Sequence, residues 1–166
     1  MDTYEAIVTK RDTRQFRPDP VDEADLRRIL QAARMAGSAK NEQVTRLLVV
    51  VEEGERARLA ECGRFARWLP SAPVVVVFVV PAEGGRPFDH GRMAQNMMLL
   101  ANSLGLASCP MTFHDGDCAR RVLGLPDDRS APMGVAFGRP GPPDPNRRSS
   151  PRIPVDELVR WGRWSD

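Results

Sequence analysis

The feature that most constrains the fold of this chain is the apolar run APVVVVFVV at residues 72–80. Most of its residues are β-branched, and a strand that is apolar at every position has to be covered on both faces. The run is about half as long as the roughly 20 residues that a membrane-spanning helix requires. We therefore expect a buried strand inside a covered sheet, and we expect no membrane segment.

Helical and strand patterns alternate along the rest of the sequence. Further strands are predicted at residues 46–52, 106–114 and 131–138. Helices are predicted at residues 3–9, 21–36, 54–69, 93–106 and 115–123. This alternation favours an α/β or α+β sandwich built on one main sheet. With 166 residues the chain has the length of one domain, so we expect residues 1–166 to form a single domain.

The helix predicted at residues 21–36 has signals at both ends. Asp22 is the expected N-cap, acidic residues fill the first turn, and arginines follow later. Gly37 is the expected C-cap. The helix predicted at residues 93–106 is apolar on nearly all sides, which indicates a place at the centre of the molecule or at a contact between subunits.

The composition changes abruptly after Gly138. The segment RPGPPDPNRRSSPRIP is rich in proline, which lacks an N–H donor and fixes φ, so it cannot continue a helix or a sheet. The following VDELVRWGRW has the pattern of a short helix. We therefore predict that residues 138–166 form an extended C-terminal arm with a short helix.

Composition and charge limit the possible partners. The formal net charge is only +2 and aromatic residues make up 6%, so a nucleic-acid-binding module is the least favoured function. The three cysteines, Cys62, Cys109 and Cys118, are odd in number and have no CxxC spacing. Together with an N-terminus unlike a signal peptide, they predict reduced thiols in a cytoplasmic protein.

Common catalytic motifs do not occur in the sequence. It contains no GxGxxG, GxxxxGK[ST], GxSxG or HExxH, and its two histidines, His90 and His114, make a poor metal site. We expect His90 to have a capping or surface role, and Asp115 and Asp117 to cap a helix rather than bind a cation. If the chain is an enzyme, a bound cofactor is expected to supply the reactive group.

Basic residues gather at two places that are far apart in the sequence. The stretch KRDTRQF, residues 10–16, has three cations around one aspartate, and Arg147, Arg148 and Arg152 form a second cluster. Each cluster alone is consistent with a solvated surface, and composition favours that interpretation. Together they suit a phosphate, because arginine offers a planar fork of donors and lysine a compact charge.

Several segments together resemble the FMN-dependent nitroreductase family. AIVTKRDTRQFRPDPVDEADLRRILQAARMAGSAKNEQ is similar to its N-terminal signature, and DHGRMAQNMMLLANSLGLASCPM to its central dimer-forming helix and the following strand. LGLP, FGRP and PRIPVDELVRW resemble its closing segments, in the family's order. The resemblance implies an α+β fold, a three-layer sandwich in which helices flank one mixed, mostly antiparallel sheet. It also implies a homodimer with an extended C-terminal arm.

The resemblance assigns residues from both ends of the chain to a flavin site. Lys10, Arg11, Asp12 and Arg14 fall on the positions that hold the FMN phosphate, the ribityl chain and the pyrimidine edge. Arg152 falls on a C-terminal arginine that joins the phosphate site. The resemblance therefore favours a phosphate site over a solvated surface for these basic residues.

Two further segments complete the implied site. Ser38 and Asn41 fall on a loop that reaches the flavin across the subunit interface. Pro110, Met111 and Thr112 fall on a strand end that lies along the isoalloxazine. A backbone N–H near Thr112 is expected to face flavin N5.

The implied activity is FMN-dependent oxidoreduction. NADH or NADPH reduces FMN by hydride transfer to N5, and a small-molecule electron acceptor, such as a quinone or a nitroaromatic compound, is reduced in turn. The flavin carries this chemistry, so no catalytic side chain is predicted.

The sequence departs from the family pattern at four positions. Lys10 replaces an arginine, Gly37 replaces a proline, and Val44 and Thr45 stand where Pro-Trp is typical. These changes imply an altered loop and an open site. They leave a second function possible, that of a flavin-binding protein that sequesters the cofactor without turnover. A third is a dimethylbenzimidazole synthase-like enzyme, which shares the aspartate at Asp12 but carries a serine where Pro110 stands.

Overall fold

The apolar run forms β2 (Val74–Pro81) inside a four-stranded sheet. The computed structural model describes residues 1–83, 85–143 and 151–164. The strand order is β1 (Arg46–Val50), β2, β4 (Arg129–Gly138) and β3 (Ala107–Thr112), and each neighbouring pair is antiparallel. Every residue of β2 except the last is buried. The prediction of a covered central strand is therefore confirmed.

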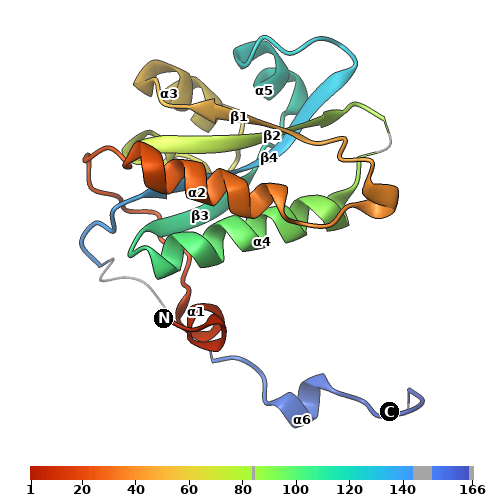
Figure 1. Cartoon of the computed structure of the whole chain (residues 1–166). Helices are drawn as coiled ribbons and strands as arrows, with labels where there is room; N and C mark the ends of the chain where they lie inside the picture. Colours follow the sequence, from red (N-terminus) through yellow and green to blue (C-terminus); the bar gives the residue numbers. More distant parts are fainter. Residues whose placement is uncertain (84, 144–150, 165–166) are drawn as a thin grey trace.

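Helices cover both faces of this sheet (Figure 1). On one face lie α2 (Glu23–Arg34) and α4 (Pro87–Ser103), and on the other lie α3 (Glu53–Glu61) and α5 (Gly116–Val122). The arrangement is a three-layer α+β sandwich, as the sequence predicts. The parallel component of the expected mixed sheet is a single bridge outside the four strands, between Asp12 and Ser108.

Alternate residues of β2 enter two separate cores, because successive side chains of a strand point to opposite faces. Val75 and Val77 belong to the core that includes Leu59 of α3. Val76 and Phe78 belong to the core under α2 and α4. The apolar character of the whole run follows from this double burial.

The N-terminal helices begin where the sequence predicts. Asp2 caps α1 (Thr3–Thr9), and the Asp22 carboxylate caps α2 by accepting from Ala24 N at 2.8 Å. The predicted C-cap at Gly37 is wrong, because α2 ends at Arg34 with Met35 as its C-cap. Gly37 instead allows a close approach, since a Cβ there would lie 2.8 Å from a guanidinium nitrogen of Arg92.

The predicted helix at residues 54–69 is wrong in its second half. α3 ends at Glu61, and a turn leads to the short 3₁₀ helix η2 (Leu69–Ser71). Gly63 permits the break, because its backbone passes close to the Thr112 carbonyl, and a Cβ there would lie 3.2 Å from that oxygen. A tertiary contact, rather than the helical pattern of the sequence, therefore determines the conformation of this segment.

α4 begins earlier than the predicted range and buries two polar residues near its start. Asp89 accepts a hydrogen bond from Ala39 N at 3.2 Å, and His90 packs against the Phe78 ring with centroids 6.2 Å apart. Only 3% of His90 is exposed, so the expected capping or surface role is wrong. Burial lowers the pKa of His90, while the Asp89 carboxylate acts in the opposite direction.

The expectation of three reduced thiols is also wrong. Cys62, the C-cap of α3, and Cys118 in α5 form a disulfide with Cα atoms 5.4 Å apart. The two residues are 56 positions apart, and they meet because α3 and α5 lie on the same face of the sheet. Cys109 is the free cysteine and is buried in β3. The predicted cytoplasmic location thereby loses the support that it drew from reduced cysteines.

Beyond β4, residues 139–141 pair with residues 15–17, and residues 151–164 lie apart from the sheet (Figure 1). α6 (Val155–Leu158) is shorter than the predicted helix, and Trp161 is 90% exposed. Arg147 and Arg148 lie outside the described residues. Within the part of the chain that the structure describes, no helix combines the length and apolar character needed to cross a bilayer.

Candidate functional site

The candidate site lies along the outer edge of β3. The segment with the cationic stretch, residues 10–16, runs beside the first half of this strand, where Thr13 N donates to Ser108 O at 3.0 Å. Phe16 then bridges to Pro140 in antiparallel orientation. No described segment pairs with the second half of the β3 edge. The predicted positions Pro110, Met111 and Thr112 occupy this second half.

The backbone of β3 presents an N–H group at that edge. Phe113 N donates to Pro132 O at 3.0 Å, and N–H directions alternate along an antiparallel strand, so the Thr112 N–H points away from β4. The backbone nitrogen of Pro110 also points away from β4, so the N–H that proline lacks costs no hydrogen bond between the strands. A ligand acceptor can therefore approach the Thr112 N–H from the side.

The cationic stretch has more positive than negative charge. Lys10 Nζ pairs with the Asp12 carboxylate and lies 3.2 Å from Met98 Sδ of α4. Arg11 donates to the carbonyl oxygens of Val8 and Lys10, both at 2.8 Å. Among the residues described, no carboxylate forms an ion pair with Arg11 or Arg14. The positive charges of Arg11 and Arg14 are thus not balanced by a described carboxylate, and guanidinium is well suited to phosphate.

Two hollows adjoin Arg14. The first, of about 260 Å³, opens over the second half of β3. Its lining residues are Arg14, Phe65, Trp68, Pro110, Met111, Thr112, His114 and Met133. The second, of about 440 Å³, extends from residues 12–15 to residues 140–143. Arg14 and Trp68 line both hollows, so an elongated ligand can span them with an anionic group near Arg14.

Cys109 lies beneath the cationic stretch but is not a reactive group. It is 1% exposed, and burial raises the pKa of its thiol to about 11. The Asp12 carboxylate acts in the same direction, and Arg14 and Lys10 oppose it. The thiol is therefore protonated near neutral pH, whereas a nucleophilic cysteine needs the thiolate.

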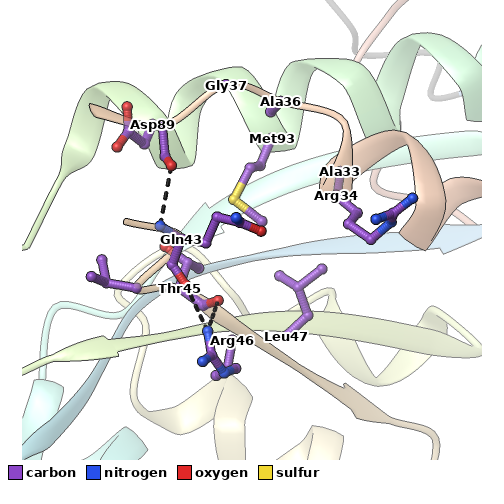
Figure 2. A pocket seen from close by; sticks show the side chains of 12 residues that line it. Ala33, Arg34, Ala36, Gly37, Gln43, Thr45, Arg46, Leu47, Asp89 and Met93 are labelled. Atoms are coloured by element: carbon purple, nitrogen blue, oxygen red, sulfur yellow. Dashed lines mark hydrogen bonds between the residues drawn. The ribbon is translucent and has the colours of Figure 1, made fainter. Parts of the chain in front are cut away.

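The loop that carries Ser38 and Asn41 borders a third hollow, of about 300 Å³, whose other walls come from α2, β1 and α4 (Figure 2). Ser38 Oγ accepts from Gln43 N at 3.1 Å, and Arg46 Nη1 donates to Gln43 O at 2.6 Å. Lys40, Asn41 and Gln43 have positive φ, which is costly for residues other than glycine. The hydrogen bonds around Ser38 hold this loop in its strained conformation.

The structure brings together some of the predicted site residues and separates others. Arg14 lines one hollow with Pro110, Met111 and Thr112. Asp12 bridges to Ser108 in the first half of β3, while Lys10 contacts Met98 of α4 and Arg11 donates to carbonyl oxygens of Val8 and Lys10. Ser38 and Asn41 do not join them within one chain. Their loop is attached to α4 at Asp89, while Lys10 contacts the same helix at Met98, nine residues later, which is about 13 Å along a helix axis.

Arg152 is likewise apart from the other predicted residues. It is exposed in the C-terminal arm, and it lines neither hollow that contains Arg14. The described residues of one chain therefore do not bring Arg152 to the hollows beside Arg14.

Sequence reasoning missed four residues that line the hollow over β3. Phe65 and Trp68 are predicted as parts of a regular helix, and the break after Glu61 instead turns them towards the sheet edge. His114 follows the end of β3 by two residues and Met133 lies in the middle of β4, and the two strands pair only in the fold. No local motif marks these four positions.

Within the described ranges, no group of His, Cys, Asp and Glu residues could hold a metal ion.

Known proteins are similar to this chain in fold and, in part, in sequence. The nitroreductase family model matches residues 7–64 and 60–139. A protein of Thermus thermophilus named NADH dehydrogenase is 30% identical, over 97% of this chain and 96% of that protein. Nitroreductase A from Vibrio parahaemolyticus has a TM-score of 0.87 and 27% identity, over 100% of this chain and 78% of its own. The NADPH:FMN oxidoreductase from Vibrio harveyi, in complex with NAD⁺, has a TM-score of 0.86 and 25% identity, over 99% and 78%.

Proposed function

The chain belongs to the nitroreductase family, and from this premise we propose that it is an FMN-dependent oxidoreductase that takes electrons from NADH or NADPH. The observation that carries the proposal is the open half of the β3 edge. There the Thr112 N–H points away from β4, beside a hollow that is lined by Arg14 and the rings of Phe65 and Trp68. The Vibrio harveyi relative, an NADPH:FMN oxidoreductase, supports the choice of cofactor and donor.

The residues along β3 fit the chemical groups of FMN. Arg11 and Arg14 suit the phosphate, because two cations can neutralise a dianion and donate several hydrogen bonds to it. The Lys10–Asp12 pair offers both a donor and an acceptor to the ribityl chain and the pyrimidine edge. The Thr112 N–H is the donor for a ring nitrogen. Two hollows that meet at Arg14 suit a cofactor with an anionic tail and a flat ring.

When bound, FMN would supply hydride transfer through its N5 atom. The protein's task is then to hold the reactants in position and to stabilise charge. The Lys10 ammonium would stabilise negative charge on the pyrimidine side, as preorganised donors do at an oxyanion site. Phe65, Trp68 and His114 flank the hollow in which a planar, electron-poor acceptor, such as a quinone or a nitroaromatic compound, would lie.

We also propose that the site is completed in a homodimer of single-domain subunits. The loop with Ser38 and Asn41 is held at Asp89, away from the cationic stretch of its own chain. In the C-terminal arm, Leu158 is 66% exposed and Trp161 90% exposed, which is unfavourable for large apolar side chains in water. A second copy would cover these residues and bring Ser38, Asn41 and Arg152 to the partner's flavin.

The test uses the purified full chain and its visible absorption. Oxidised flavin is expected to make the protein yellow, or to bind when FMN is added. NADH or NADPH should bleach the colour without oxygen, and a quinone or nitroaromatic acceptor should restore it. A protein that binds no FMN would contradict the proposal.

The same measurement separates the alternatives. A yellow protein that neither NADH nor NADPH bleaches would indicate sequestration of flavin. Dimethylbenzimidazole formed after aerobic reduction of bound FMN would indicate a flavin-fragmenting enzyme. Sedimentation analysis should give the mass of a dimer, and Leu158→Asp should shift it towards the monomer. The matched control is Val51→Asp directly after β1, outside α4 and the C-terminal arm, where the side chain is 54% exposed, and it should leave the mass unchanged.

A further inference from the structure

The hollow over β3 has an aromatic wall made of Phe65 and His114. Their ring centroids are 6.0 Å apart at an interplanar angle of 77°, an edge-to-face arrangement. Arg64 N donates to His114 Nδ1 at 3.3 Å, so the neutral ring carries its proton on Nε2. Nε2–H is therefore the ring donor that remains for a ligand in the hollow.

A disulfide ties together the two segments that carry this wall. Phe65 follows Cys62 by three residues, and His114 precedes Cys118 by four. The segments share one further backbone link, Asp115 N to Cys62 O at 3.1 Å. Phe65 is 72% exposed, so burial of its ring contributes little to fixing the loop. The covalent link is thus the strongest constraint on the spacing of the two rings.

The same loop presses directly against the end of β3. A Cβ at Gly63 would lie 3.2 Å from Thr112 O, which belongs to the residue whose N–H faces the proposed flavin. Gly63 directly follows Cys62. A movement of the disulfide-bonded loop would therefore change the shape of the hollow at the point where an acceptor would lie.

From these contacts we propose that the Cys62–Cys118 disulfide positions Phe65 and His114 as a wall that selects planar acceptors, and that its reduction relaxes this selection. The proposal rests on the proposed oxidoreductase function. A flat ring fits against an edge-to-face pair, and the His114 Nε2–H can donate to an oxygen at the ring edge, as in a quinone or a nitro group. A compact, non-planar acceptor such as ferricyanide needs neither contact.

The redox step requires a dithiol as the reductant. A dithiol thiolate attacks one sulfur of the disulfide, and the bond between Cys62 and Cys118 breaks. The second thiol of the reductant then releases the protein from the mixed disulfide. Two electrons and two protons pass to the protein, which gains two cysteine thiols, and the reductant leaves as a disulfide.

The first experiment measures how Phe65 and His114 are arranged, without any flavin reaction. The chain has two histidines, so the His114 ring resonances can be assigned by NMR with the variant His114→Gln. In the oxidised protein they should be displaced by the ring current of Phe65, and Phe65→Leu should remove this displacement. Dithiothreitol should remove it too, while Cys118→Ser should show the relaxed position with or without dithiothreitol. Cys118 is the half-buried partner of the pair, so serine is better tolerated there than at Cys62.

The second experiment compares two acceptors with the FMN-loaded enzyme. Reduction of the disulfide should raise the KM for menadione by roughly two- to tenfold, which corresponds to the loss of an aromatic contact, and should leave kcat nearly unchanged. The rate with ferricyanide should not change. Cys118→Ser should reproduce the raised KM and lose its response to dithiothreitol.

The outcomes separate this proposal from the proposed function. If NADH and NADPH fail to reduce the flavin, no acceptor is turned over, and the oxidoreductase assignment fails while the NMR result still decides whether the disulfide holds the wall. The wall proposal is overturned if the untreated protein has three free thiols. It is also overturned if His114 resonances or the menadione KM stay unchanged after complete reduction. Should reduction unfold the protein, an unchanged menadione KM in oxidised Phe65→Leu overturns it as well.

Discussion

The main-chain N–H of Thr13 donates to the carbonyl oxygen of Ser108 at 3.0 Å, and this contact fixes the cationic stretch to the first half of β3. It places Arg14 beside the open second half of the strand, where Pro110 and Thr112 lie. Two segments that are far apart in the sequence thereby meet at one sheet edge.

Arg14→Ala should weaken FMN binding by about ten- to a hundredfold, because a hydrogen bond to a charged group contributes about 1.5–3 kcal/mol. Titration of FMN fluorescence against the apoprotein measures the change. The matched control is Arg27→Ala on α2, where the guanidinium pairs with Glu23 at 2.7 Å away from β3. Equal losses in both variants would indicate that general charge, rather than position, determines binding.

Thr112→Pro should separate the role of an edge N–H from that of the sheet. The Thr112 N–H points away from β4, so its removal costs no ladder hydrogen bond and Tm should change little. Flavin reduction by the nicotinamide should slow by about ten- to a hundredfold, the range for loss of a positioned donor. Phe113→Pro is the contrasting variant, since it removes the donor to Pro132 O and should lower Tm clearly. An unaltered reduction rate in a folded Thr112→Pro protein would remove this N–H from the mechanism.

Two glycines should respond in opposite directions to replacement by alanine. A Cβ at Gly138 would lie 2.6 Å from Pro73 Cδ and 2.9 Å from a Phe16 ring atom, and neither ring can move freely. Gly138→Ala should therefore lower the free energy of unfolding by roughly 1–3 kcal/mol. At Gly91 in α4 nothing lies within 4 Å of the added Cβ, so Gly91→Ala should raise it by about 0.5–1 kcal/mol. Urea denaturation of both variants measures the difference.

Alkaline pH should destabilise the fold through Cys109. Burial raises the pKa of its thiol to about 11 from the usual 9.0, so the folded state holds the proton more tightly than the unfolded state. The stabilisation is complete below the unfolded value and is lost as pH rises through the folded one, at up to about 1.4 kcal/mol per pH unit. The free energy of unfolding should thus fall more steeply between those pH values in the wild type than in Cys109→Ala. Parallel curves for the two proteins would contradict the assignment.

Local patterns were sufficient to predict the layers of the fold. The continuous apolar run implied a strand covered on both faces, and β2 enters both cores. Asp22 marked the start of α2, because a carboxylate before an acidic first turn satisfies free N–H groups. Signals of this kind act within a few residues, so they can be recognised in a single sequence.

The errors arose where distant segments determine the local conformation. Gly63 leaves the helical path because it packs against the end of β3, and Cys62 bonds to a cysteine 56 residues away. His90 is polar by type but lies against Phe78 inside the molecule. The same limit applied to the site, where the family resemblance supplied the cationic stretch and the β3 end, but Phe65 and His114 became recognisable only once both segments were placed at the sheet edge.

A strand edge that is kept open for a ligand is also a template on which another chain can add a strand and start aggregation. Pro110 is the first residue of the open half of β3, and it lacks the N–H donor that an incoming strand would need at that position. The residue that lines the binding surface therefore also disfavours aggregation by strand addition when no ligand covers that edge.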